Sequence, residues 1–193
     1  MYMAYNIRGT NGSGKTTLAK NLLKRYEHEF IECEPVPHYY VPRLNLIVVG
    51  RYTNPCGGVD AVKATSDELQ KFIEESLKKH NVLFEGIIVS TVFQRWYEMA
   101  SKDICELKIF YLKPELDTCI RRVIERRQAK GNNKPFDERT LVNKYKIIEN
   151  TVNKFRAKGF WVKELNEASQ KEAYKALIHE IKLDLKSQKE AEE

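Results

Sequence analysis

The feature that most constrains this chain is a glycine-rich run close to its start, Gly9-Thr10-Asn11-Gly12-Ser13-Gly14-Lys15-Thr16. The three glycines permit backbone conformations that larger residues avoid, and they let backbone N–H groups approach an anion closely. Lys15 can place a point charge on phosphate oxygens, and the hydroxyl of Thr16 can ligate Mg²⁺. The spacing therefore predicts a cradle for the phosphates of a nucleotide.

The flanking residues supply the structural context that such a cradle needs. Residues 4–8 are predicted to form a strand, and residues 17–26 a helix with Leu18, Leu22 and Tyr26 on one face. A helix that begins at the loop directs the positive end of its dipole at the same anion. The whole pattern resembles the phosphate-binding loop of P-loop NTPases. The resemblance implies that ATP, with Mg²⁺ on Thr16, is bound by Gly9, Thr10, Asn11, Gly12, Ser13, Gly14, Lys15, Thr16 and Thr17.

Composition indicates one globular domain in a reducing compartment. The chain has 193 residues, of which 42% are hydrophobic, and it has no apolar run long enough to span a membrane. The four cysteines are scattered, which argues against a zinc cluster or a disulfide framework and favours the cytoplasm, with no membrane partner. The net charge of +6 is compatible with a substrate rich in phosphates, and equally with surplus surface lysine.

Strand and helix patterns alternate along the chain. Predicted strands lie at residues 4–8, 44–50, 81–86, 107–112 and 160–165, and a shorter candidate at 29–33 is ended by Pro35. Helices are predicted at residues 17–26, 66–77, 91–101, 114–130, 137–158 and 168–186. This order predicts an α/β fold with three layers, in which helices flank a mostly parallel five-stranded sheet. Residues 1–186 would form a single P-loop domain and residues 187–193 a charged, frayed tail.

Arginines cluster after the strand at residues 107–112. A helix that Pro114 can start carries arginines at 121, 122, 126 and 127, and a polar loop follows it. This arrangement resembles the strand, helix and lid of nucleoside monophosphate kinases, thymidylate kinases above all. The resemblance implies an arginine-rich lid at residues 121–136, from which Arg122 and Arg126 stabilise the transferring phosphate. A solvated helix whose arginines pair with Glu125 is the alternative.

A carboxylate ends the strand at residues 81–86. Thymidylate kinases carry an Asp-Arg pair here, whereas this chain has Glu85-Gly86. Glu85 can orient the shell of Mg²⁺ through water, or it can accept a proton from the acceptor. An acceptor hydroxyl gains from such a base, whereas an acceptor phosphate hardly needs one. Glu85 therefore favours phosphorylation of a hydroxyl, although it can also simply cap the strand.

Two further segments supply candidates for binding the acceptor. Arg51 could hold a phosphate of a mononucleotide or of DNA, and Asp60 could bind metal or act as an alternative base. Gln94 could hydrogen-bond a pyrimidine edge, and Arg95 could offer a cationic face to an exposed base. For Arg51 and Asp60 the alternative is a plain surface turn. For Gln94 and Arg95 it is ordinary packing or solvent exposure.

Taken together, the phosphate loop, Gly50-Arg51-Tyr52 with Cys56-Gly57-Gly58-Val59-Asp60, Phe84-Glu85-Gly86 and the arginine lid resemble phage kinases of the thymidylate kinase superfamily, in particular those acting on 5-hydroxymethyluracil in DNA. The resemblance spans nearly the whole chain. It implies transfer of the γ-phosphate of ATP to the hydroxymethyl group of a base in DNA, in the host cytoplasm, with a homodimer left open.

Two other functions compete with this hypothesis. A kinase for free deoxynucleoside monophosphates is the first, and the missing arginine at position 86 argues against it. A nucleotide-dependent switch is the second. GTPase switches read guanine with N-K-x-D, and the two Asn-Lys pairs at residues 143–144 and 153–154 both lack the aspartate.

Overall fold

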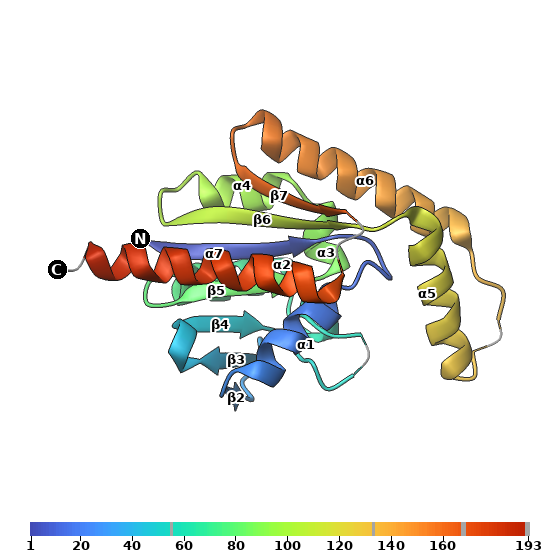
Figure 1. Ribbon diagram of the computed structural model, residues 1–193, viewed down its shortest axis with the longest axis horizontal. Coiled ribbons are helices and arrows are strands. Elements are labelled where there is room, and N and C mark those ends of the chain that lie inside the picture. Colours follow the sequence, from blue (N-terminus) through green and yellow to red (C-terminus); the bar gives the residue numbers. More distant parts are fainter. Residues whose placement is uncertain (55, 133, 167–168, 192–193) are drawn as a thin grey trace.

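A seven-stranded sheet forms the middle layer of the protein (Figure 1). The computed structural model describes residues 1–54, 56–132, 134–166 and 169–191. The strands are β1 (Tyr2–Arg8), β2 (Glu29–Ile31), β3 (His38–Val41), β4 (Leu46–Val49), β5 (Asn81–Glu85), β6 (Cys105–Lys113) and β7 (Trp161–Asn166). The α-helices are α1 (Lys15–Arg25), α2 (Ser66–Ser76), α3 (Ile87–Thr91), α4 (Gln94–Ala100), α5 (Leu116–Ala129), α6 (Glu138–Ala157) and α7 (Gln170–Glu190). Two 3₁₀ turns, η1 (Pro42–Leu44) and η2 (Val59–Ala61), lie in the loops.

The strand order is β2-β3-β4-β5-β1-β6-β7. The strands from β4 to β7 in this order are mutually parallel, which confirms the predicted α/β fold with a mostly parallel sheet. The sheet nevertheless has two strands more than the five predicted, because β2 and β3 extend its edge in antiparallel pairing. Residues 38–41 contain strand-favouring Tyr and Val, but the run is too short and too close to two prolines to be predicted, and pairing with β2 and β4 stabilises it.

Each face of the sheet carries its own hydrophobic core, because alternate side chains of a strand point to opposite faces. Tyr5 and Ile7 of β1 belong to the core beneath α1 and α7. Ala4, between them, belongs to the core beneath α2 and α4. Figure 1 shows α1 and α7 side by side across the front of the sheet. The loops that follow β1, β4, β5 and β6 therefore meet at the carboxyl edge.

Helix boundaries differ from the prediction in two places. The helix predicted at residues 91–101 corresponds to α4, and the short helix α3 that precedes it was not predicted. The last helix continues beyond residue 186 to Glu190, because Gln188 donates hydrogen bonds to the carbonyl of Met1 (3.0 Å) and to Asn81 (2.9 Å). Its predicted start, residue 168, and the final residues 192–193 lie outside the described residues. None of the described helices combines the length and the hydrophobicity that crossing a bilayer requires.

Candidate active site

The glycine-rich run joins β1 to α1 at the carboxyl edge of the sheet. Gly14 has a left-handed φ of 98° at the start of α1, and a Cβ there would collide with Nε2 of Gln170. Gly12 has a φ of 81°, and its Cβ would lie 2.5 Å from the carbonyl oxygen of Cys119. These glycines therefore permit both the turn of the loop and the close approach of α5 and α7 to it.

Lys15 lies inside the loop that precedes it. Its side chain is buried, and Nζ donates hydrogen bonds to the carbonyl oxygens of Gly9 (2.7 Å) and Thr10 (3.1 Å). Burial lowers the pKa of Lys15, and the nearby carboxylates of Glu85 and Asp60 oppose that shift. The loop thus holds an ammonium group where phosphate oxygens would lie.

A cavity of about 390 Å³ opens over this loop. It combines the phosphate loop with the loop after β4, the end of β5, one face of α5 and the start of α7. Its lining residues are Thr10, Asn11, Gly12, Gly14, Lys15, Thr16, Thr17, Cys56, Gly57, Asp60, Glu85, Arg122, Arg126 and Gln170. Segments that are far apart in the sequence therefore face one space.

Glu85 lies in the wall of this cavity and is only 1% exposed. Its Oε1 accepts a hydrogen bond from Oγ1 of Thr16 at 3.1 Å. Burial raises the pKa of Glu85 to about 7, against the opposing charge of Lys15 and the hydrogen bond from Thr16. Gly58, with a φ of 75°, packs so closely on the carboxylate that any Cβ would collide with it. The result is a carboxyl group poised to exchange a proton near neutral pH.

The donor set of the cavity fits a nucleotide bound with Mg²⁺. The hydroxyls of Thr10 and Ser13 are buried and have no hydrogen-bond partner within the described part of the chain. The loop that carries them can wrap an anion, which would give these hydroxyls an acceptor. Oγ1 of Thr16 and the carboxylate of Glu85 are adjacent hard oxygen ligands, the kind that Mg²⁺ prefers.

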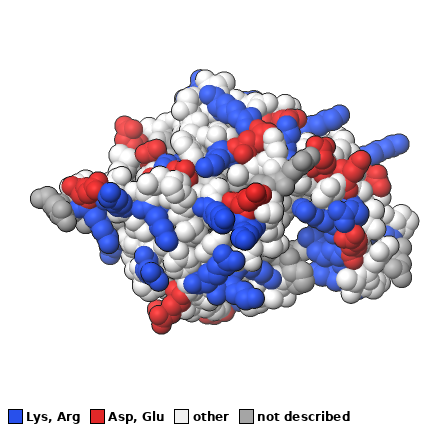
Figure 2. Space-filling view, viewed as in Figure 1, with Lys and Arg blue, Asp and Glu red and all other residues white. Residues whose placement is uncertain are grey.

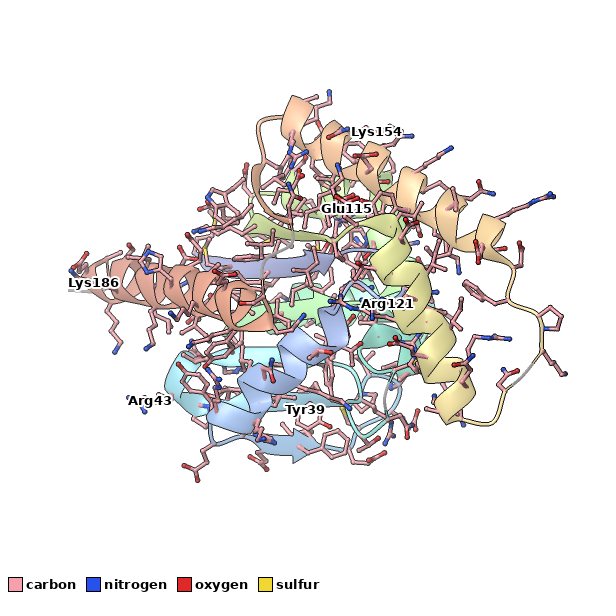
Figure 3. All side chains as sticks on the ribbon, turned by 45° about the vertical axis from the view of Figure 1, so that its right-hand side comes forward. Tyr39, Arg43, Glu115, Arg121, Lys154 and Lys186 are labelled. Carbon is pink, nitrogen blue, oxygen red and sulfur yellow. The ribbon has the colours of Figure 1, made fainter. Side chains whose placement is uncertain are left out.

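The arginines of α5 divide between two surroundings. Arg122 and Arg126 line the cavity, and Nη1 of Arg122 donates to the carbonyl of Gly12 at 3.1 Å. Arg121 pairs with Glu125 (3.1 Å), and Arg127 donates to the carbonyl of Lys134 (3.0 Å). Figure 3 shows α5, labelled at Glu115 and Arg121, beside the start of α1. Two of the four arginines are thus placed to reach a bound phosphate.

The sequence pattern of the 5-hmdU DNA kinase family matches residues 2–166. The chain belongs to this family. A 5-hmdU DNA kinase of Pseudomonas phage PaMx11 is 32% identical over 186 residues, covering 90% of this chain and 95% of the relative. The 5-hmdU DNA kinase of Pseudomonas phage M6 is 29% identical over 188 residues, covering 91% and 97%. The match confirms the predicted resemblance, and the chain is a kinase.

The fold has a counterpart among solved structures. A crystal structure from Chloroflexus aurantiacus aligns with a TM-score of 0.51 at 13% identity, covering 96% of this kinase and 97% of that chain. At this level of identity the likeness concerns the fold alone. The three-layer arrangement of the kinase therefore recurs in proteins with little sequence in common.

The carboxylate of Asp60 accepts hydrogen bonds from the backbone of the kinase. Its Oδ2 accepts a hydrogen bond from the backbone N–H of Ile87 (2.7 Å), and its Oδ1 accepts one from that of Ile88 (3.2 Å). The carboxylate caps the start of α3 while its residue lines the cavity. These hydrogen bonds give Asp60 a structural role, and its interpretation as a metal ligand or alternative base stays a prediction.

Three other predicted acceptor-binding residues do not line the cavity. Arg51 forms a bidentate pair with Glu32 on the exposed side of its loop. Gln94 donates to Glu98 at 2.6 Å, and Arg95 pairs with Asp67 (2.8 Å) and Gln70 (2.7 Å) on α2. Each side chain is satisfied by a neighbour outside the site, which is the alternative that the sequence left open.

Gln170 is a site residue that sequence reasoning missed. It lies at the first position of α7, against Gly14, and its Oε1 is buried without a partner among the described residues. It also lines a second cavity of about 340 Å³, which shares Arg122 with the first and extends between Pro114 and Ser169. A capping box of Ser169 and Glu172 starts α7 here, but no local pattern places residue 170 beside residue 14.

Proposed function

We propose that this kinase transfers the γ-phosphate of ATP to the hydroxymethyl oxygen of 5-hydroxymethyluracil in DNA. The observation that carries the proposal is Glu85, a buried carboxyl group beside Thr16 in the cavity of the phosphate loop. Membership of the 5-hmdU DNA kinase family supports 5-hydroxymethyluracil in DNA as the acceptor, because the phage relatives bear that name.

The phosphates of ATP would lie in the loop of residues 9–17, and its base in the adjoining second cavity. Lys15 would exchange its hydrogen bonds to loop carbonyls for contacts with the phosphates. Thr16 would hold Mg²⁺, with Glu85 orienting the shell of the ion through water. When bound, Mg²⁺ would neutralise negative charge on the phosphate oxygens.

Glu85 would act as the base. The acceptor oxygen forms a bond to the γ-phosphorus, the bond from that phosphorus to the β–γ bridging oxygen breaks, and the hydroxyl proton passes to the carboxylate. The reaction needs Glu85 ionised, and burial holds its pKa at about 7. Transfer would therefore become faster as the pH rises through about 7.

Arg122 and Arg126 would stabilise the transferring phosphoryl group. Both side chains line the cavity from one face of α5, and a planar guanidinium matches the charge that spreads over the equatorial oxygens. The segment at residues 121–136 would then serve as the lid, apart from residue 133, which lies outside the described residues. Arg122 would give up its contact with Gly12 when the phosphates bind.

The part of the cavity wall that lies outside the phosphate loop, α5 and α7 favours a neutral acceptor. Within the described residues it consists of Cys56, Gly57, Asp60 and Glu85, which include no basic side chain. Arg51, the candidate for an acceptor phosphate, is paired with Glu32 outside the cavity. A hydroxyl acceptor suits this wall better than the phosphate of a free mononucleotide.

An acceptor panel tests the proposal. The enzyme is incubated with Mg²⁺ and ATP labelled on its γ-phosphate, together with duplex DNA containing 5-hydroxymethyluracil, the matched duplex containing thymine, or free thymidylate. We expect label on the first duplex alone. Label on thymidylate with none on either duplex would establish a mononucleotide kinase instead.

A further inference from the structure

Five lysines form a stripe along α7. Lys171, Lys175, Lys182, Lys186 and Lys189 are all exposed. At about 100° of rotation per residue they fall within roughly 60° of one another, over about 27 Å of helix. The acids of the opposite side bind the sheet, since Asp184 accepts from Lys108 (2.7 Å) and from the hydroxyl of Tyr5 (2.8 Å). The helix therefore turns Asp184 toward the sheet and its lysines outward, while Glu172 and Glu190 are exposed.

Neighbouring elements extend this charge. The α1 helix packs beside α7, and the guanidinium of Arg25 lies 4.2 Å from the ring centre of Tyr174. Neither α1 nor η1 contains an acidic residue, and both contribute basic side chains. With the α7 stripe, Lys20, Lys24, Arg25 and Arg43 make up what we call the basic face. Figure 2 shows Lys and Arg gathered across this side of the molecule.

The basic face is largely free of compensating carboxylates. Within the described residues, Lys186 is its one member in an ion pair, a 3.6 Å contact with Glu190 on the same helix. At the far end of α7, Arg43, Lys182, Lys186 and Lys189 surround a shallow hollow of about 250 Å³. Figure 3 shows Arg43 and Lys186 on the same side of the molecule. Such clustered, unpaired charges create a positive potential that attracts a polyanion.

We propose that the basic face binds the phosphate backbone of duplex DNA outside the reaction cavity. The α7 helix begins at Gln170 in the cavity wall, so the face extends away from the site of transfer. Its length of about 27 Å matches roughly eight base pairs at about 3.4 Å each.

The chemistry of the face selects the backbone of a duplex. Lysines contact phosphates as point charges and read no sequence, which suits an enzyme that must find a modified base in any context. Surfaces for single strands stack bases on exposed aromatic residues, whereas Tyr174, the ring against Arg25, is buried. The inference rests on the proposed function only in taking DNA as the polyanion.

The test compares two triple variants that lose the same charge. Lys182→Gln/Lys186→Gln/Lys189→Gln removes the far end of the face. Lys71→Gln/Lys79→Gln/Lys146→Gln removes exposed lysines from α2, the loop after it and α6. Binding of a fluorescent duplex containing only thymine is followed by anisotropy between about 50 and 200 mM salt. Thermal melts confirm that each variant is folded.

We expect the first triple variant to lower the slope of log K against log salt by about 2.7, because each lysine that neutralises a phosphate contributes about 0.9. Affinity near 0.1 M salt should fall at least about tenfold. The second triple variant should change the slope by less than about 1. Equal losses in both variants would overturn the proposal, since they would reflect net charge alone. Binding to anionic lipid vesicles but not to the duplex would also overturn it.

The two proposals fail separately. If the wild-type enzyme binds the thymine duplex through these lysines but phosphorylates no modified DNA, the proposed function is wrong and the proposed role of the basic face is supported. If it phosphorylates modified DNA while the first triple variant binds duplex like the wild type, the proposed role of the basic face is wrong and the proposed function is supported.

Discussion

The two halves of the reaction cavity are built in different ways. The phosphate half comes from one continuous segment, residues 9–17, whose backbone and Lys15 form the cradle. The acceptor half is assembled from the loop after β4, the end of β5 and the start of α3. Local conformation determines the first half, whereas packing between distant segments determines the second. Substitutions should therefore have severe effects on one half and graded effects on the other.

The phosphate half should be the more sensitive. Lys15→Ala removes the single ammonium group inside the loop. We expect transfer to fall by about a thousandfold or more, because the positive charge that would contact the transferring phosphate is lost. The measurement is single-turnover transfer of labelled phosphate. The fold should be kept, since a buried charge is removed. Activity within tenfold of the wild type would contradict the role of the loop.

Glu85 is the functional group of the acceptor half. Glu85→Gln keeps its shape and its contact with Thr16 but removes the base, so turnover should fall about a hundredfold while ATP affinity is kept. In the wild type, kcat/KM should rise with pH through about 7, the pKa to which burial raises this carboxyl. The variant should lose that rise. A rate that is unchanged at every pH would exclude Glu85 as the base.

The arginines of α5 connect the two halves and should have intermediate effects. Arg122→Gln and Arg126→Gln should each lower kcat by about tenfold to a hundredfold, because a charge-assisted contact to the moving phosphate is lost. Arg139→Gln is the matched control, since this exposed arginine at the start of α6 lines neither cavity. If all three variants behaved alike, the two cavity arginines would have no special role.

The remaining candidates of the acceptor half should matter least. Arg51→Gln, Gln94→Ala and Arg95→Gln remove side chains that are paired with Glu32, Glu98 and Asp67 outside the cavity. We expect each to change kcat/KM by less than about threefold, in line with the small energies of exposed pairs. A loss above tenfold for any of them would show that DNA rearranges this region on binding.

The sequence predicted the parts of the molecule that local physics controls. The phosphate loop was recognisable because Gly12, Gly14 and Lys15 lie in one continuous segment. The parallel strands were recognisable because their apolar runs are long. Glu85 was recognisable because it ends such a run. The short strand β3 was missed, since residues 38–41 become a strand through pairing with β2 on one side and β4 on the other.

The acceptor half shows why the rest could not be predicted. Asp60 looked free for chemistry, but the backbone N–H groups of α3, more than twenty residues later, bind it. Arg51 looked free for a phosphate, but Glu32 pairs with it from another loop. Gln170 gave no signal, since its role depends on contact with Gly14 across the fold. Partners distant in sequence decide these roles.

The most direct measurement of the central claim locates the transferred phosphate. A duplex with blocked 5′ ends and one 5-hydroxymethyluracil is treated with the enzyme, Mg²⁺ and ATP, then digested to nucleotides with nucleases that spare monoesters, and analysed by mass spectrometry and phosphorus NMR. The account predicts a phosphomonoester on the hydroxymethyl oxygen. An unmodified hydroxymethyl group, in duplex that the enzyme has bound together with ATP, would contradict it.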